Sequence, residues 1–204
     1  MLLQRVRSFL PALLALGLAL FGGGGSAAAA PVLLVLGDSV SAGYGLAAGT
    51  GWVTLLSQRL QAEGYPYTVV NASISGDTTA GGKARLPSYL SKNQPAIVVI
   101  ELGGNDALRG GNLAATRANL DAMVTAALDA KAKVLIVGMQ VPPNYGPAYA
   151  RDFNALFADI AKLRRVPVVP AFFAGFGDDL AMFQPDRIRQ STHRRSCSTT
   201  SGRR

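Results

Sequence analysis

Short apolar runs alternate with longer amphipathic segments along residues 32–169, and this alternation limits the possible folds more than any other feature of the chain. The apolar runs predict strands at residues 32–36, 67–70, 97–100, 134–137 and 166–169. Apolar residues at helical spacing predict helices at residues 52–63, 83–90, 113–131 and 149–164, with Pro87 as a kink or break in the second. Strands that alternate with helices argue for a parallel sheet that is covered on both faces. We therefore expect one domain over residues 31–188, a three-layer α/β/α sandwich with a parallel, flavodoxin-like sheet.

The first thirty residues have the pattern of a secretory signal peptide. Arg5 and Arg7 give a basic start, an apolar stretch follows at residues 9–21, and the three alanines at 28–30 form an A-x-A-like cleavage site. The apolar stretch is shorter than the roughly 20 residues that a membrane-spanning helix needs. We therefore expect residues 1–30 to be removed, leaving a periplasmic or secreted product with no stable membrane anchor.

The formal net charge of +8 does not describe the expected domain. Residues 1–30 contribute two arginines and the last eighteen residues contribute six, whereas residues 31–186 hold equal numbers of basic and acidic side chains. A neutral domain gives no reason to expect a nucleic-acid partner. The single cysteine, Cys197, lies in the basic tail, so an internal disulfide is excluded and stability must come from the core.

The most distinctive polar feature is Gly-Asp-Ser at residues 37–39, directly after the first predicted strand. Ligands of open α/β folds bind at the carboxyl ends of the strands, and this turn holds the Ser39 hydroxyl there. A serine hydroxyl is a poor nucleophile unless a base removes its proton and donors stabilise the oxyanion that forms. If a helix begins at Ser39, the amide N–H of that residue is one such donor.

Two further donors follow later strands. Gly76 offers a backbone N–H that no side chain shields, and Asn105 offers its side-chain amide. Each turn has a simpler explanation by itself, because Asn and Gly tolerate left-handed backbone conformations. Their order after successive strands predicts a serine esterase whose oxyanion donors are Ser39, Gly76 and Asn105.

On these motifs the chain resembles the SGNH (GDSL-type) hydrolases, and most of all their bacterial periplasmic branch of acyl-CoA thioesterases, arylesterases and lysophospholipases. The shared stretches are Gly-Asp-Ser-Val-Ser-Ala-Gly-Tyr-Gly at 37–45, Asn-Ala-Ser-Ile-Ser-Gly-Asp-Thr-Thr at 71–79, Glu-Leu-Gly-Gly-Asn-Asp at 101–106 and Pro-Pro-Asn-Tyr-Gly at 142–146. The resemblance implies the SGNH hydrolase fold, Ser39 as nucleophile and Asp38 as a brace of the turn. It also implies a small ester, thioester or lysophospholipid as substrate. The sequence shows no metal cluster and suggests no cofactor, and we expect a monomer.

The end of the chain departs from the family's pattern. The family closes its site with Asp-x-x-His-Pro, in which the histidine is the base and the aspartate orients it. The resemblance gives the orienting role to Asp186, but position 189 is arginine, which stays protonated and is no general base. The sole histidine, His193, lies seven residues after Asp186.

Two explanations of this basic tail, residues 189–204, stay open. In one, His193 moves into the site. It stands four residues after position 189, and four extended residues span up to about 13 Å, so a rebuilt loop can bring it there. In the other, the tail is translated out of frame and disordered. It is rich in Arg, Ser and Thr. If residues 191–195 are encoded by TCC ACC CAC CGC CGN, the frame that starts at the third base of the Ser191 codon reads His-Pro-Pro-Pro.

Three functions follow from these alternatives. The first is an esterase or thioesterase, crippled if the histidine is lost, and the second is an inactive homologue that binds lipid or acyl chains. The third, a flavodoxin-like phosphate or nucleotide binder, is disfavoured because the loop after residue 36 is poor in basic residues and lacks a glycine-rich phosphate fingerprint.

Overall fold

Strands and helices alternate through residues 29–141 and 145–173, the parts of the chain that the computed structural model describes. The strands are β1 (Val32–Gly37), β2 (Thr68–Asn71), β3 (Ile97–Glu101), β4 (Lys133–Val137) and β5 (Val168–Val169). The helices are α2 (Ser39–Ala42), α3 (Trp52–Ala62), α4 (Thr79–Asn93), α5 (Gly104–Leu108), α6 (Leu113–Asp129) and α7 (Pro147–Arg164). Asp186, Arg189, His193, the tail at 189–204 and nearly all of the expected signal segment lie outside the described residues.

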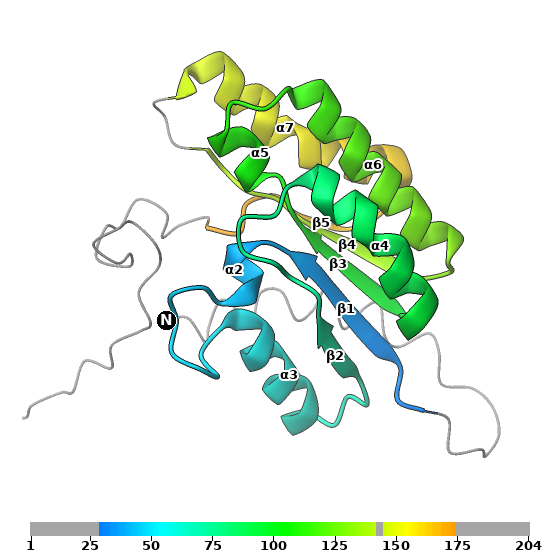
Figure 1. Cartoon of the computed structure of the whole chain (residues 1–204). Coiled ribbons are helices and arrows are strands. Elements are labelled where there is room, and N and C mark those ends of the chain that lie inside the picture. Colours follow the sequence, from blue (N-terminus) through cyan, green and yellow to red (C-terminus); the bar gives the residue numbers. More distant parts are fainter. Residues whose placement is uncertain (1–28, 142–144, 174–204) are drawn as a thin grey trace, which may run out of the picture.

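The five described strands form one parallel sheet in the order β2-β1-β3-β4-β5. Helices α4, α6 and α7 cover one face of this sheet and α3 lies against the other (Figure 1). The predicted three-layer sandwich with a flavodoxin-like sheet is thereby confirmed. The chain passes from β1 outward to β2 and then returns to β3 on the other side of β1. In such sheets ligands bind beyond the carboxyl ends of the two strands where the order reverses, here β1 and β3.

The central strands are buried on both faces, which explains why their sequences are continuously apolar. Leu34 and Leu36 of β1 pack in the cluster beneath α4, α6 and α7, together with Phe153. Leu33 and Val35 point the opposite way, into the cluster that α3 closes. Each such side chain contributes roughly 1.5–3 kcal/mol when it is fully buried. The same two strands therefore anchor the sheet and fix where their carboxyl ends stand.

Two helices differ from the sequence-based expectation. Helix α4 begins at Thr79 rather than at residue 83, because the Thr78 hydroxyl accepts a hydrogen bond from the Gly81 amide and caps the helix. It runs past Pro87 as one helix, so of the two alternatives expected there, a kink or a break, the break is wrong. Buried Leu86 beside the proline packs into the core. Helix α5 was not predicted, since Gly-Gly-Asn-Asp was interpreted as a turn.

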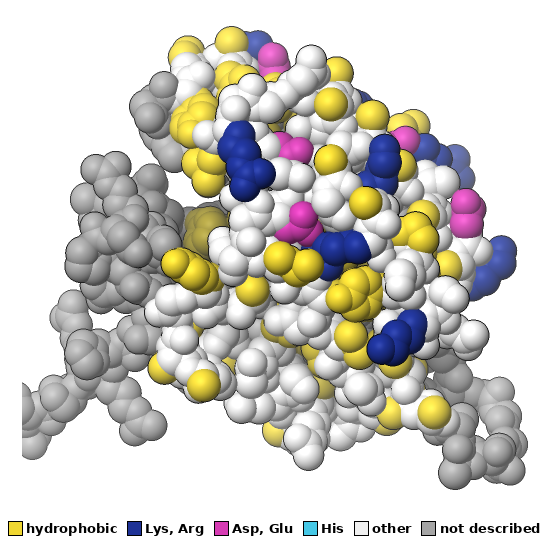
Figure 2. Space-filling model, viewed as in Figure 1, with side chains coloured by type: hydrophobic (Ala, Val, Ile, Leu, Met, Phe, Trp, Pro, Cys, Tyr) yellow, Lys and Arg dark blue, Asp and Glu magenta, His cyan; other side chains and the backbone are white. Residues whose placement is uncertain are grey.

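On the face of the molecule drawn in Figure 2, charged side chains are spread without a dominant sign. On the face in Figure 2, Lys and Arg side chains stand among acidic, apolar and neutral polar ones. This distribution agrees with the balanced charge of residues 31–186. Within the described ranges, no helix is both long and apolar enough to cross a membrane.

Candidate active site

Ser39 is the first residue of α2 and stands at the carboxyl end of β1, as predicted. Asp38 is the N-cap of this helix, and its Oδ1 accepts a hydrogen bond of 3.0 Å from the Val40 amide. Gly43 ends the helix with a φ of +75°, a value that favours glycine, and its N–H donates to the Ser39 carbonyl. The half-buried Ser39 is therefore held on a single capped turn.

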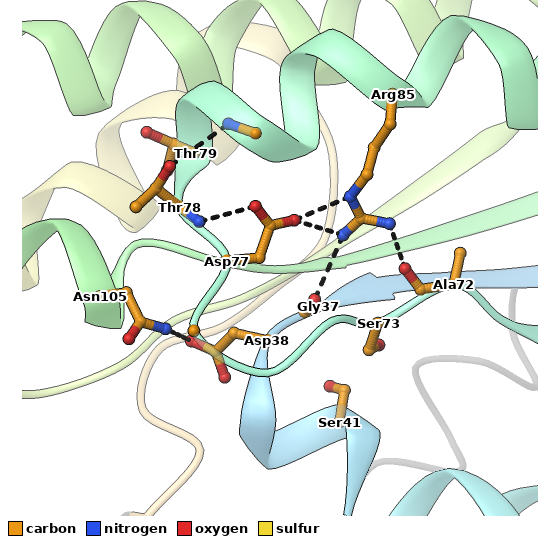
Figure 3. Close-up of polar contacts among 12 residues, drawn as sticks. Gly37, Asp38, Ser41, Ala72, Ser73, Asp77, Thr78, Thr79, Arg85 and Asn105 are labelled. Atoms are coloured by element: carbon orange, nitrogen blue, oxygen red, sulfur yellow. Dashed lines mark hydrogen bonds and ion pairs between the residues drawn. The ribbon is translucent and has the colours of Figure 1, made fainter.

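Asn105 lies in the first turn of α5 and is tied to the turn that carries Ser39. Its Nδ2 donates a hydrogen bond of 3.0 Å to Asp38 Oδ2 (Figure 3). An amide group has two N–H donors, so this contact uses one of them. Asp38 thus caps α2 with one oxygen and orients Asn105 with the other, in agreement with the bracing role expected for it.

Gly76 lies in the loop between β2 and α4, with a φ of +79° that favours glycine. Its carbonyl accepts a hydrogen bond of 2.9 Å from Nη2 of Arg109, the residue that follows α5. The amide of Ile74, two residues earlier, donates to the Gly37 carbonyl at 3.0 Å. The loop that carries Gly76 is therefore bonded both to the end of β1 and to the end of α5.

An ion pair lies next to this loop, and sequence analysis did not select its members. Arg85 Nη2 is 2.6 Å from Asp77 Oδ2, and Arg85 Nε donates to the same oxygen at 2.8 Å. The guanidinium also donates to the carbonyls of Ala72 and Gly37, so one side chain joins the carboxyl ends of β1 and β2 (Figure 3). Arg85 was missed because it lies inside a helix, eight residues from its partner.

Asp106 makes a second connection between the same loops. One of its oxygens accepts from the Thr79 amide at 2.9 Å and the other from the Thr79 hydroxyl at 2.5 Å. The Thr116 hydroxyl donates to it at 3.4 Å. These contacts fix the start of α4 against α5, and so help to set the distance between the Gly76 loop and Asn105. The only signal in the sequence was the position of Asp106 directly after Asn105.

Two acidic side chains are buried at the turn that carries Ser39. Asp38 is 2% exposed and Glu101, the last residue of β3, is 0% exposed. Burial raises the pKa of the Asp38 carboxyl from 3.8 to about 6, although the Val40 amide and Asn105 act in the opposite direction. Burial, and next the nearby Asp38, raise the pKa of Glu101 well above its usual value. Glu101 was not selected from the sequence, although it stands in the stretch at 101–106.

The structure thus joins the loops of all three predicted oxyanion donors by direct hydrogen bonds, whereas Asp186 and His193 lie outside the described residues. The chemistry available at this edge is a serine hydroxyl beside amide donors. No group of three or more His, Cys, Asp or Glu side chains that can hold a metal ion occurs in residues 29–141 and 145–173.

Known proteins match most of this chain. The sequence model of the GDSL-like Lipase/Acylhydrolase family matches residues 35–193. Esterase TesA of Pseudomonas aeruginosa is 53% identical over 161 residues, which cover 79% of this chain and 80% of that protein. Thioesterase 1/protease 1/lysophospholipase L1 of Escherichia coli is 44% identical over 146 residues, covering 72% of this chain and 69% of that protein. A crystal structure of TesA superposes with a TM-score of 0.75 at 52% identity, covering 78% of this chain and 88% of that one.

Proposed function

The chain belongs to the GDSL-like lipase/acylhydrolase family, also called the SGNH hydrolases, and on this premise we propose that it cleaves carboxylic esters and thioesters through an acyl-serine intermediate at Ser39. The relatives that match it carry the names esterase and thioesterase/lysophospholipase, so aryl esters, acyl-CoA and lysophospholipids are the proposed substrates. The observation that supports this function best is the pair of hydrogen bonds, Asn105 to Asp38 and Arg109 to Gly76, which join the loops of the nucleophile and the other donors.

The proposed reaction uses these groups in two steps. The Ser39 hydroxyl attacks the carbonyl carbon, and the carbonyl oxygen takes up the negative charge. The amides of Ser39 and Gly76 and the second N–H of Asn105 stabilise that oxyanion, each donor being worth about 10²- to 10³-fold in rate. The alcohol or thiol then leaves, and water releases the acyl group from Ser39.

This chain lacks the family's histidine at the position where it would accept the Ser39 proton. The family pattern puts that histidine at position 189, with Asp186 to orient it, and arginine stands there instead. In serine hydrolases the loss of a triad member lowers kcat by about 10⁴- to 10⁶-fold. We therefore expect turnover at Ser39 to be at least about 10⁴-fold slower than in a chain with the complete triad.

Hydrolysis of p-nitrophenyl esters of several acyl lengths by the purified protein tests the function. We expect a slow release of p-nitrophenol that disappears in Ser39→Ala. Ser91→Ala makes the same change on an exposed part of α4 and should keep the wild-type rate. If wild type and Ser39→Ala react equally slowly, the hydrolase proposal fails, and saturable binding of a fatty acid would then identify an inactive acyl-binding homologue.

Two substitutions in the tail test the assignment of the base. Arg189→His rebuilds the Asp-x-x-His spacing after Asp186, and we expect it to raise kcat by about 10²-fold or more. His193→Ala should leave the slow wild-type rate unchanged. If His193→Ala instead abolishes Ser39-dependent turnover, His193 serves as the base, and the tail belongs to the active site.

We also propose that residues 1–30 are removed on export and that a monomer of the domain at 31–188 acts in the periplasm or outside the cell. The basic start, the apolar stretch and the alanines before Pro31 support this. Sequencing the amino terminus of protein recovered from the periplasm of a bacterial host should give Pro31 as the first residue. An intact amino terminus would contradict the removal of residues 1–30, and protein confined to the cytoplasm would contradict export. Size-exclusion chromatography of the periplasmic sample tests the monomer.

A further inference from the structure

Glu101 lies beneath the turn that carries Ser39, and the reaction proposed above does not use it. It is the last residue of β3 and pairs in register with Gly37 of β1. Its Oε2 accepts a hydrogen bond of 2.5 Å from the Ser41 hydroxyl. Its Oε1 is buried as well and has no hydrogen-bond partner among the described residues. A side chain that is 0% exposed with one oxygen unpaired costs stability, so its presence calls for an explanation.

Gly37 shows how closely the groups around Glu101 approach one another. A Cβ added at Gly37 would lie 2.5 Å from Ser41 Oγ and 2.8 Å from Glu101 Oε2. Both distances are shorter than a Cβ atom tolerates, so only glycine leaves room for the hydrogen bond between Ser41 and Glu101. The glycine of Gly-Asp-Ser therefore has a packing role as well as a role in the turn.

The surroundings of Glu101 favour a neutral carboxyl group. Burial and the neighbouring Asp38 raise its pKa, while the Ser41 hydroxyl and the amides of Asp38 and Ser41 act in the opposite direction. No basic side chain of the described residues takes part; Arg85 is engaged by Asp77. Burying an ionised carboxylate without a cation is far more costly than burying the neutral acid. A neutral acid can still accept a hydrogen bond from Ser41, and it adds no second negative charge next to Asp38.

Ser41 transmits these contacts to the nucleophile because both residues belong to the single turn of α2. A helix of four residues has no stability of its own and depends on tertiary contacts. Ser41 supplies two of them, since its hydroxyl donates to Glu101 and its carbonyl accepts from Asn71 Nδ2 at 2.9 Å. The turn is thus held from the ends of both neighbouring strands, β3 and β2.

We propose that Glu101 is a positioning residue for Ser39: by bonding to Ser41 it fixes the turn of α2, and with it the direction of the Ser39 hydroxyl and amide. This inference rests on the proposed function, because it takes Ser39 as the nucleophile. A misplacement of about 1 Å can lower a rate by about 10²-fold, so the hydrogen bond acts on the reaction without touching the substrate.

Three variants test the inference. Glu101→Gln keeps the shape and an acceptor for Ser41 but is neutral at every pH. Glu101→Met keeps the length and removes both oxygens, and Ser41→Ala removes the other partner with the smallest change of volume. The first readout is the single release of p-nitrophenol when a p-nitrophenyl alkylphosphonate modifies Ser39, because it remains measurable in a slow enzyme. The second is the change of kcat against KM for a p-nitrophenyl ester.

We expect Glu101→Met and Ser41→Ala to lower the phosphonylation rate and kcat by about 10- to 100-fold while KM changes little, and Glu101→Gln to restore the wild-type rate. Ser91→Ala serves as the control, and if Glu101→Met does not fold, Ser41→Ala decides. Wild-type rates in Ser41→Ala, or a Glu101→Gln variant as slow as Ser41→Ala, overturn the inference alone. A wild type that reacts no faster than Ser39→Ala overturns the proposed function, and this inference with it.

Discussion

Two acidic regions flank the turn that carries Ser39, and they differ in whether a cation compensates them. On one side, Asp77 pairs with Arg85 at 2.6 Å. On the other side, Asp38 and Glu101 are buried next to each other, and among the described residues no basic side chain acts on either carboxyl. The compensated pair joins the ends of β1 and β2 and stabilises the fold. The uncompensated pair destabilises the fold at neutral pH, yet its hydrogen bonds reach α2 and Asn105.

The difference indicates that the compensated region serves the stability of the fold and the uncompensated region serves the reaction. Strongly perturbed carboxyl groups gather at functional sites, because there the position of a group matters more than its contribution to stability. On this account, damage to the compensated region should appear mainly in the free energy of unfolding. Damage to the uncompensated region should appear mainly in the reaction rate. Substitutions on each side can separate the two.

The largest effect is expected on the uncompensated side, from Asn105→Ala. The substitution removes one proposed oxyanion donor and the partner of Asp38, so Ser39-dependent kcat should fall by about 10²- to 10³-fold. Asn93→Ala, at the far end of α4, is the control and should keep the rate. The ester assay described above measures both. Equal rates in the two variants would remove Asn105 from the oxyanion site.

On the compensated side, Arg85→Met should cost about 3 kcal/mol in the free energy of unfolding, because it leaves Asp77 and two strand-end carbonyls without their donor. Arg117→Met breaks an exposed pair with Asp159, whose side chains are 44% and 54% exposed, and should cost no more than about 0.5 kcal/mol. Urea titration of both variants gives the comparison. A similar, small loss in both would show that the ion pair behind Gly76 does not stabilise the fold.

The pH dependence of stability distinguishes the two regions further. The pKa of Asp38 is about 6 in the fold against an ordinary 3.8, so between these values the native state binds more protons than the unfolded state. The free energy of unfolding is therefore highest below pH 4, where Asp38 is protonated in both states. As the pH rises towards 6, Asp38 lowers this free energy by an amount on the order of 3 kcal/mol.

Asp38→Asn should remove this loss, so its stability relative to wild type should rise between pH 4 and 6. The control is Asp129→Asn at the exposed end of α6, whose stability relative to wild type should not rise in this way. Urea titrations of the three proteins across this range make the measurement. Parallel curves for wild type and Asp38→Asn would contradict an uncompensated, buried Asp38.

The smallest effect is expected from Gly76→Ala. The added methyl group has room, because its nearest neighbour would be Arg109 Nη2 at 3.8 Å. The cost is the positive φ alone, about 1–2 kcal/mol of unfolding free energy. Thermal unfolding measures it, with Gly64→Ala, which also has a positive φ and open space, as the matched control. A much larger loss than in Gly64→Ala would mean that the backbone of the Gly76 loop is constrained by more than its φ.

The sequence was sufficient for the sheet and for the placement of the donors at its edge, because buried parallel strands are continuously apolar and polar residues follow where they end. It was not sufficient for contacts that depend on register. Ser41 and Glu101 are sixty residues apart and meet only because Gly37 pairs with Glu101. Arg85 likewise reaches two strand ends from inside a helix that was expected to begin later and to kink or break at Pro87.

The most direct test of the account is to find which serine an organophosphorus ester modifies. The full chain is incubated with a p-nitrophenyl alkylphosphonate, and the adduct is located by peptide mass spectrometry. We expect one adduct, on Ser39, which is absent in Ser39→Ala and forms more slowly in Ser41→Ala. An adduct on Ser41 or Ser73, or equal labelling of wild type and Ser39→Ala, would contradict Ser39 as the nucleophile that these hydrogen bonds hold in place.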